Sequence, residues 1–177
     1  MKYVILVDEH DHETGTMEKM EAHKKGLLHR AFSVLIFNSK GEMLLQRRAN
    51  SKYHSGGLWT NTCCSHPQPG ETMVQAAQRK LFQEMGIVCD LIYSHKFIYK
   101  AHLDNNLIEH EFDHLLIGYY DGLPAINEQE AQAFKFESPE VIKMDAEQNP
   151  AAYASWFKLI LKQPEFQRIL QHKSSNS

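Results

Sequence analysis

The chain of 177 residues is poor in cysteine, has no long apolar run and carries no excess of basic residues. Its three cysteines cannot form a complete set of disulfides, so we expect a reduced, cytoplasmic protein. Acidic residues number 22 against 19 lysines and arginines, which argues against a nucleic-acid partner. Because the apolar run near the start is short and is followed by acidic residues and histidines, neither a signal peptide nor a membrane span is expected.

The chain does contain enough apolar material, 42% of its residues, for a hydrophobic core. Charged residues make up 23%, as in an average soluble protein, and no segment rich in proline, glycine or serine divides the chain. We expect one domain over residues 1–177 with a frayed tail at 173–177, and a monomer rather than an oligomer. The 11 histidines are many for this length and are the first indication of metal or acid–base chemistry.

Apolar and turn patterns predict strands, one central helix, more strands and then helices. Strands are predicted over 4–7, 31–37, 42–47, 58–64, 87–98 and 107–120, with the second and third forming a hairpin. The last should pair with 97–102 across a turn at 104–106, Gly15 should lie in a turn, and 16–22 fits either a helix or a strand. Ser138 followed by Pro139 predicts a helix start, and 151–171 predicts a terminal helix. This order indicates an α+β fold with a mixed or antiparallel sheet flanked by helices.

The clearest predicted helix covers 71–85. Val74, Ala77, Leu81 and Met85 fall on one stripe at helical spacing, and Gly86 follows as a residue that ends the helix.

An acidic strand is the first candidate metal site. Successive side chains on a strand alternate between faces, so Glu109, Glu111 and Asp113 share one face. Residues two apart are about 7 Å apart along a strand, which lets two carboxylates converge on one cation. The alternative is a solvated acidic edge, with the core side formed by His110, Phe112 and His114.

His23, His29 and His66 lie far apart in the sequence and lack a diagnostic metal-binding spacing. Each taken alone is typical of a surface or capped histidine. If they met two glutamates, the site would have five mixed nitrogen and oxygen ligands, more than the usual tetrahedral zinc site. Such a shell suits six-coordinate Mn²⁺ or Mg²⁺, although Zn²⁺ could occupy it in vitro.

Residues 65–87 are similar to the Nudix box, Gly-x5-Glu-x7-Arg-Glu-U-x-Glu-Glu-x-Gly-U, where U is apolar. The positions that match are Glu71, Arg79, Leu81, Glu84, Gly86 and Ile87. Ser65, Lys80 and Gln83 depart from the pattern, and the last two replace carboxylates that hold Mg²⁺ in Nudix hydrolases. We therefore expect a Nudix-like fold with weak water-activated cleavage, although Lys80 and Glu84 could also simply pair on the helix surface.

Nine short runs, taken in order, resemble type 1 isopentenyl-diphosphate Δ-isomerase. The most specific are Trp-Thr-Asn at 59–61, Cys-x-His-Pro at 64–67 and Glu-x-Glu at 109–111. The others are 31–33, 38–41, 47–49, 70–71, 84–86 and 155–156. Together they span about residues 19 to 156.

The resemblance implies an isomerase of isoprenoid biosynthesis that interconverts isopentenyl and dimethylallyl diphosphate by protonation and deprotonation. Its implied metal ligands are His23, His29, His66, Glu109 and Glu111, which would hold Mn²⁺ or Mg²⁺, or Zn²⁺ in their place. Its implied catalytic groups are Cys64 (not Cys63), Glu111, Tyr99 and Trp156. Glu84 would bind the Mg²⁺ that accompanies the substrate diphosphate, and the diphosphate would be held by Lys19, Arg48 and Lys52.

Two other functions compete with this interpretation. One is a Nudix hydrolase of a diphosphate substrate, which Lys80 and Gln83 disfavour. The other is a histidine-rich metal-binding or redox module that uses Cys63 and Cys64. Without the resemblance, Cys64 would be interpreted as a small buried residue and Trp156 as helix core.

Overall fold

A computed structural model describes residues 2–174, and the side chains of residues 2–171. The prediction of a frayed tail at 173–177 concerns mostly positions outside the described residues. Within them, the strands are β1 (Tyr3–Val7), β2 (Glu13–Glu18), β3 (His29–Phe37), β4 (Met43–Arg48), β5 (Trp59–Thr60), β6 (Cys63–Ser65), β7 (Leu91–His102), β8 (Ile108–Tyr119) and β9 (Ala131–Glu137). The α-helices are α1 (Lys19–Lys25), α2 (Met73–Met85), α3 (Pro139–Gln148), α4 (Ser155–Lys162) and α5 (Pro164–Ser174).

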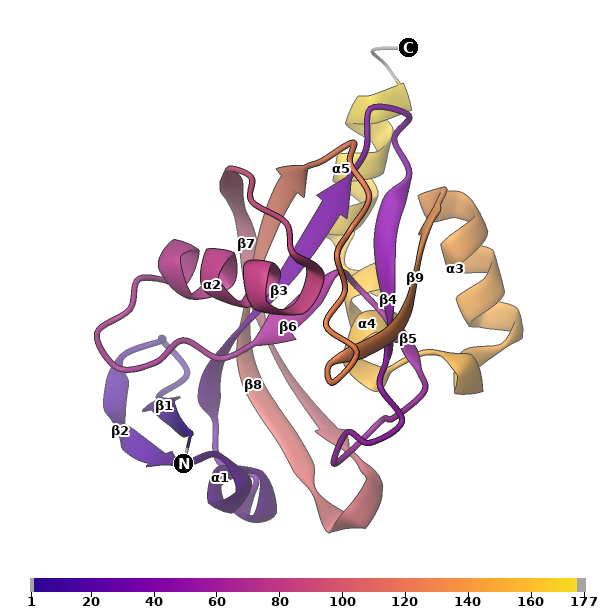
Figure 1. Ribbon diagram of the computed structural model, residues 1–177. Helices are drawn as coiled ribbons and strands as arrows, with labels where there is room; N and C mark the ends of the chain where they lie inside the picture. Colours follow the sequence, from indigo (N-terminus) through magenta and orange to yellow (C-terminus); the bar gives the residue numbers. More distant parts are fainter. Residues whose placement is uncertain (1, 175–177) are drawn as a thin grey trace.

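One mixed sheet organises the fold, and β3 is its centre (Figure 1). β3 pairs antiparallel with β1, β4 and β6, and parallel with β8 over the run from His29–Glu111 to Phe37–Tyr119. β7 continues the sheet beyond β8, and β9 lies antiparallel beside β4. The predicted α+β arrangement with a mixed sheet flanked by helices is confirmed.

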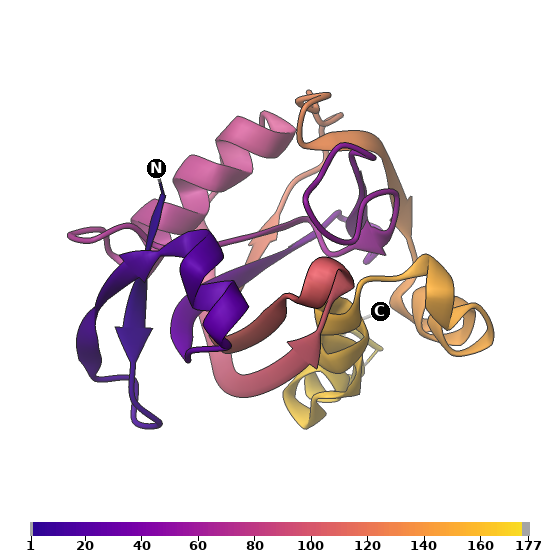
Figure 2. The same ribbon diagram turned by 90° about the horizontal axis from the view of Figure 1, so that it is seen from below.

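Alternation along β3 divides the core into two halves. Phe32, Val34 and Ile36 face a cluster that includes buried residues of α2, whereas Leu35 and Phe37 face a cluster built from α3, α4 and α5. Figure 1 shows α2 on one face of the sheet and α4 with α5 on the other, and Figure 2 shows the same layers from below. A sheet buried on both faces explains why 31–37 is apolar at every position except Ser33.

The central helix ends at the predicted residue, Met85, but begins at Met73, two residues after the predicted start. Thr72 caps α2 through a capping box with Gln75, and Gly86 ends it with φ 65°, a left-handed conformation that favours glycine. A methyl group at Gly86 would also lie 2.8 Å from Ala125 Cβ. The predicted stripe is buried at Ala77, Leu81 and Met85, but Val74 is exposed, so that part of the prediction is wrong.

Several other predicted boundaries were wrong for local reasons. The strand predicted over 58–64 is split into β5 and β6, because Thr62 turns its hydroxyl to the backbone of β3 and β4. The terminal helix is split at Pro164, which has no N–H and restricts the residue before it. Gly15 lies in β2 opposite Leu6 rather than in a turn, 16–22 passes from β2 into α1, and β9 was not predicted.

Residues 2–174 include no helix that is long and apolar enough to cross a membrane.

A charged cluster centred on Asp11 ties the first hairpin to the sheet. Asp11 accepts a hydrogen bond from Arg30 Nε at 2.8 Å and lies 3.0 Å from His114 Nε2 and 3.4 Å from Lys96 Nζ. Burial of Asp11 opposes its charge, but the bond and charge of Arg30, with His114 and Lys96, hold its pKa below the usual value. The carboxylate therefore stabilises the fold above the pKa of the unfolded state, and this contribution is lost as the pH falls.

We expect Asp11→Asn to lower the free energy of unfolding by about 1–2 kcal/mol at pH 7, because charge-assisted hydrogen bonds are replaced by neutral ones. The left-handed φ of 69° at Asp11 suits asparagine, so the change removes charge without adding strain. Urea denaturation should show the difference from wild type shrinking between about pH 5 and pH 3. The exposed Asp90→Asn is the control, and a difference that stays constant over this range would contradict the assignment.

Candidate active site

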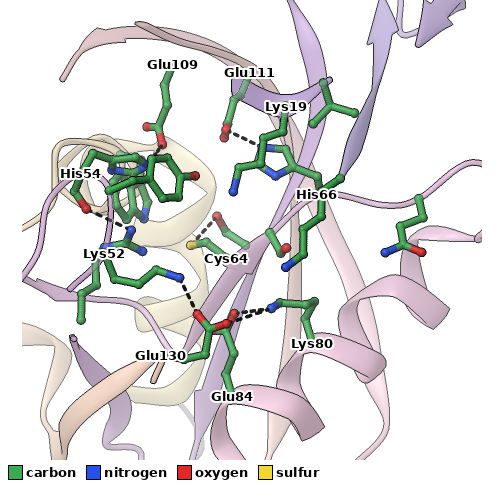
Figure 3. A pocket seen from close by; sticks show the side chains of 18 of the residues that line it. Lys19, Lys52, His54, Cys64, His66, Lys80, Glu84, Glu109, Glu111 and Glu130 are labelled. Atoms are coloured by element: carbon green, nitrogen blue, oxygen red, sulfur yellow. Dashed lines mark hydrogen bonds and ion pairs between the residues drawn. The ribbon is translucent and has the colours of Figure 1, made fainter. Parts of the chain in front are cut away.

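A pocket between the loop at 49–58, the N-terminal segment and the sheet gathers most of the residues predicted for the site (Figure 3). His23 and His29 lie behind its wall, within reach of His66 and Glu111. The predicted residues that line it are Lys19, Arg48, Lys52, Cys64, His66, Glu84, Tyr99, Glu109, Glu111 and Trp156.

Three histidines and a glutamate from four different segments converge beside this pocket. His23 lies in α1, His29 begins β3, His66 follows β6 and Glu111 lies in β8. The parallel register of β3 and β8 sets His29 directly opposite Glu111. One ligand atom from each of the four residues lies within 4.8 Å of all the others. These atoms are close enough to share one cation.

The orientation of two of these imidazoles is fixed by the backbone. His23 Nδ1 lies 2.8 Å from the carbonyl oxygen of Lys19, and His29 Nδ1 lies 2.8 Å from that of Leu27. A carbonyl only accepts, so each Nδ1 carries the proton and each Nε2 keeps a lone pair. Both Nε2 atoms are buried and have no hydrogen-bond partner among the described residues. Such an arrangement is typical of histidines that ligate a metal.

Two carboxylates complete the donor set. Glu111 Oε1 lies 2.9 Å from His66 Nε2, and the Tyr99 hydroxyl donates to Glu111 at 2.7 Å and to Glu109 at 3.1 Å. Burial and the charge of Glu111 raise the pKa of Glu109. Burial also opposes ionisation of Glu111, but the neighbouring imidazoles of His29 and His66 outweigh that effect and lower its pKa.

The acidic face of β8 is therefore not a solvated edge. Glu109, Glu111 and Asp113 are only 5%, 6% and 1% exposed. Buried carboxylates need a compensating charge or hydrogen bonds. The three imidazole nitrogens and the carboxylate oxygens form a mixed donor set that fits a divalent cation.

Alternation along β6 separates the two adjacent cysteines. Cys63 is fully buried against α2, whereas Cys64 faces the pocket. The Cys64 thiol donates to Asn61 Oδ1 at 3.0 Å, and the amide nitrogen of Asn61 donates to two backbone carbonyls, which fixes that orientation. Ser33 Oγ lies 3.4 Å from the Cys64 sulfur. Burial raises the pKa of Cys64, so the thiol form is favoured.

The pocket also holds a group of basic side chains. Lys19 lies with its ammonium 4.5 Å from the centre of the Tyr53 ring, and burial together with the charge of Lys52 lowers its pKa to about 8. The predicted cations Lys19, Arg48 and Lys52 are joined there by Lys2, Arg79 and Lys80. A cluster of cations in a partly buried pocket fits an anionic ligand.

Lys80 and Glu84 form an ion pair of 3.0 Å, so the pairing considered from the sequence is confirmed. Its predicted place on the helix surface is wrong, because the two residues are only 5% and 6% exposed. Gln46 Nε2 donates to the other oxygen of Glu84 at 3.0 Å. Glu130 lies 2.5 Å from Lys52 and 3.8 Å from Lys80. In Figure 3 Lys80, Glu84 and Glu130 lie on one side of Cys64, with Glu109, Glu111 and His66 on the other.

Trp156 is both core and pocket residue. It is 2% exposed in α4, yet it lines the pocket with its indole N–H free of any partner among the described residues. The guanidinium carbon of Arg48 lies 5.1 Å from the centre of the indole, and the His54 ring meets the indole edge-on at 5.7 Å.

Comparison with known proteins assigns the chain to a family. A protein-family model described as the NUDIX domain matches residues 27–158. A Pectobacterium atrosepticum protein named isopentenyl-diphosphate Delta-isomerase is 47% identical over 173 residues, covering 97% of each chain. The isopentenyl-diphosphate Delta-isomerase 1 of Aromatoleum aromaticum is 51% identical over 155 residues, covering 88% of each chain. The chain belongs to the isopentenyl-diphosphate Delta-isomerases of the Nudix superfamily.

Solved structures confirm the Nudix fold predicted for this isomerase family member. DR0079 from Deinococcus radiodurans superposes with a TM-score of 0.74 at 18% identity, covering 90% of this chain and 97% of its own. The NUDIX domain of Shewanella oneidensis NrtR, solved with ADP ribose, superposes with a TM-score of 0.60 at 15% identity, covering 87% and 99%.

Four side chains in this isomerase pocket were not identified from the sequence. Ser33, Asn61 and Glu130 contact predicted residues directly. Ser33 and Asn61 lie in runs that carry the family resemblance but were given no role of their own, and Glu130 lies in no predicted motif. His54 lies between the predicted strands 42–47 and 58–64 and was assigned no role there, although it is 4% exposed and borders Glu109. The adjacent Tyr53 and the unusually high histidine content were the signals that could have indicated it.

We expect Glu111→Gln to weaken binding of Mn²⁺ by at least about tenfold, because the amide loses the charge that faces the three imidazoles. Titration of metal-free protein, followed by calorimetry, measures the dissociation constant. The exposed Glu128→Gln is the matched control. Unchanged Mn²⁺ affinity in Glu111→Gln would exclude this residue as a ligand.

Proposed function

We propose that this protein interconverts isopentenyl diphosphate and dimethylallyl diphosphate by adding a proton at one carbon and removing one from another. The observation that carries the proposal is a pocket in which a thiol, Cys64, and a buried acid, Glu111, occur together beside a basic cluster. Relatives that are 45–51% identical over most of the chain are named isopentenyl-diphosphate Delta-isomerases, which supports the same function.

The substrate has a carbon–carbon double bond and no acidic proton, so the site must add a proton to one weakly reactive carbon and remove a proton from another. Protonation at C4 gives a tertiary carbocation, and loss of a proton from C2 gives the allylic product. Cys64 and Glu111 are the pair of groups for these two steps, one as acid and one as base. Tyr99 holds Glu111 through its hydroxyl and limits the positions this carboxyl can take.

The buried lone pairs of His23 and His29, with His66, Glu109 and Glu111, fit a divalent cation. When bound, Mn²⁺ or Mg²⁺, or Zn²⁺ in its place, would supply a positive charge that adjusts the acidity of Glu111. The histidine side chains hold their donor atoms in position through the carbonyls of Lys19 and Leu27.

Lys19, Arg48 and Lys52 are the proposed partners of the diphosphate, and Lys80 adds a further positive charge. Glu84, oriented by Gln46, would hold the Mg²⁺ that enters with the diphosphate. Glu130 pairs with Lys52, and a diphosphate would compete with it for that lysine.

Trp156 contributes an indole against which positive charge is stabilised, by about 0.5–2 kcal/mol. Burial in the cluster formed by α3, α4 and α5 holds the ring in place and keeps water from that side. Exclusion of water matters because water would capture the cation as an alcohol.

We further propose that the protein acts in the cytoplasm, as a monomer, on a free small diphosphate rather than on nucleic acid or a membrane. The slight acidic excess and the three free cysteines support this setting.

Incubation with isopentenyl diphosphate in deuterated buffer, with and without chelator, tests the function directly. Metal-dependent incorporation of deuterium into the allylic product is expected. Release of phosphate or pyrophosphate at a comparable rate, without isomerisation, would instead support a Nudix hydrolase.

We expect Cys64→Ser to reduce the isomerisation rate at least about 100-fold, because a hydroxyl replaces the thiol in a proton-transfer role. Metal content should stay nearly unchanged, since Cys64 does not belong to the cluster of ligand atoms. Cys89→Ser is the control because Cys89 lies away from the pocket. Activity above a few per cent of wild type would remove Cys64 from this role.

Trp156→Phe should keep part of the activity, with a loss of about 2- to 30-fold, because a smaller aromatic face remains. Trp156→Leu should lose more, since no aromatic face is left. Turnover at saturating substrate measures the effect, and urea denaturation of both variants separates it from loss of stability. Equal activity of the two variants would contradict a role for the aromatic face.

A further inference from the structure

His54 enters the pocket from a loop whose backbone is tightly held. Ser55 has φ 52°, a left-handed conformation that is unusual for serine, and its N–H donates to Asp104 Oδ2 at 3.2 Å. Arg48 Nη2 donates to the carbonyl oxygen of His54, also at 3.2 Å. A methyl group at Gly57 would lie 2.7 Å from Asn50 Oδ1. A strained, closely packed loop of this kind is typical of a segment that positions a functional side chain.

The His54 imidazole is buried on the Glu109 side of the pocket (Figure 3). Its Nε2 lies 3.6 Å from Glu109 Oε1, and its Nδ1 lies 3.2 Å from the hydroxyl of Ser55. Edge-on contacts with Tyr53 and Trp156 fix the plane of the ring. The hydroxyl can accept a hydrogen bond from Nδ1–H, which leaves the Nε2 lone pair directed into the site.

His54 forms a second group of convergent ligand atoms with His23 and Glu109, again all within 4.8 Å of one another. Ligands bonded at about 2.1 Å to one octahedral ion lie about 3 Å apart when adjacent and about 4.2 Å apart when opposite. The spacing of this second group is therefore close to that of ligands on a single ion.

His23 belongs to both groups, and this limits the number of ions. Its Nε2 has one lone pair, so it can bind only one ion at a time. Tyr99 bonds to Glu109 and to Glu111 and so ties the two groups together. An ion bound by His23 and Glu109 would therefore lie within reach of His54 as well.

We propose that His54 is a fourth histidine ligand of this cation and fills the sixth position of an octahedral shell. The inference rests on the metal centre of the proposed function and adds a residue to the five implied by the family resemblance. A shell of six protein ligands leaves no place for a bound water. A metal centre without bound water suits a pocket in which a carbocation must not meet a nucleophile.

Water-proton relaxation of the Mn²⁺-loaded, full-length protein tests this directly, because a water bound to Mn²⁺ relaxes bulk water strongly. Wild type should bind one Mn²⁺ and show low relaxivity, as expected without a bound water. His54→Ala opens one position, so relaxivity should rise to the value for one exchanging water, and Mn²⁺ affinity should fall at least about tenfold. His102→Ala, at the exposed end of β7, should match wild type in both measurements.

Other outcomes overturn the proposal. If His54→Ala binds Mn²⁺ more weakly but keeps the wild-type relaxivity, His54 only supports Glu109 by a hydrogen bond and is not a ligand. High relaxivity in wild type overturns it without any variant, so a His54→Ala protein that fails to fold still leaves a decisive measurement. If the wild-type protein does not bind one Mn²⁺, the metal centre itself is refuted. If it binds one Mn²⁺ but its relaxivity is high, only the role of His54 is refuted.

Discussion

Two glutamates buried side by side on β8 determine what the rest of the site must supply. Glu109 and Glu111 point to the same face of the strand, lie almost out of contact with water and share one tyrosine hydroxyl. Two carboxylates so close together are stable only when neighbouring groups or a cation offset their charge. The parallel pairing of β3 with β8 brings His29 opposite Glu111, and α1 and the segment after β6 bring His23 and His66 to the same place. Folding and site assembly therefore depend on the same strand register.

How much of this was predictable depended on how local each signal is. Period-two alternation placed Glu109 and Glu111 on one face, and Gly86 marked the end of α2, because both patterns act within a few residues. The same alternation separates Cys63 from Cys64, although the sequence alone could not say which face held the pocket. The meeting of His23, His29 and His66 is a matter of tertiary structure, and only the family resemblance indicated it. His54 had neither a spacing nor a motif, so its position followed only from the fold of the loop that carries it.

The fold is shared with Nudix proteins of low sequence identity, but helix α2 has different charged side chains from those of the Nudix box. In the Nudix box, the carboxylates of the helix hold ions that activate water. Here Lys80 replaces one of those carboxylates, pairs with Glu84 and lies within 3.8 Å of Glu130. A lysine at this position offers a positive charge to an anionic ligand and removes a ligand for a catalytic ion. The same scaffold can thus keep its affinity for diphosphates while losing the means to hydrolyse them.

Hydrolysis and isomerisation place opposite demands on water, and the pocket fits the demands of isomerisation. A hydrolase must bind and activate a water molecule, whereas an isomerase that passes through a carbocation must keep water away. Cys64 is favoured as an uncharged thiol by burial, and its immediate neighbours Asn61 and Ser33 are fixed by the protein. Trp156 belongs to the hydrophobic core on one side of the sheet, and His54 stands between it and Glu109. The side chains around Cys64 are therefore supplied by packed parts of the fold. Such packing fits a reaction that must exclude water, and for which polar groups are buried despite the cost of burying them.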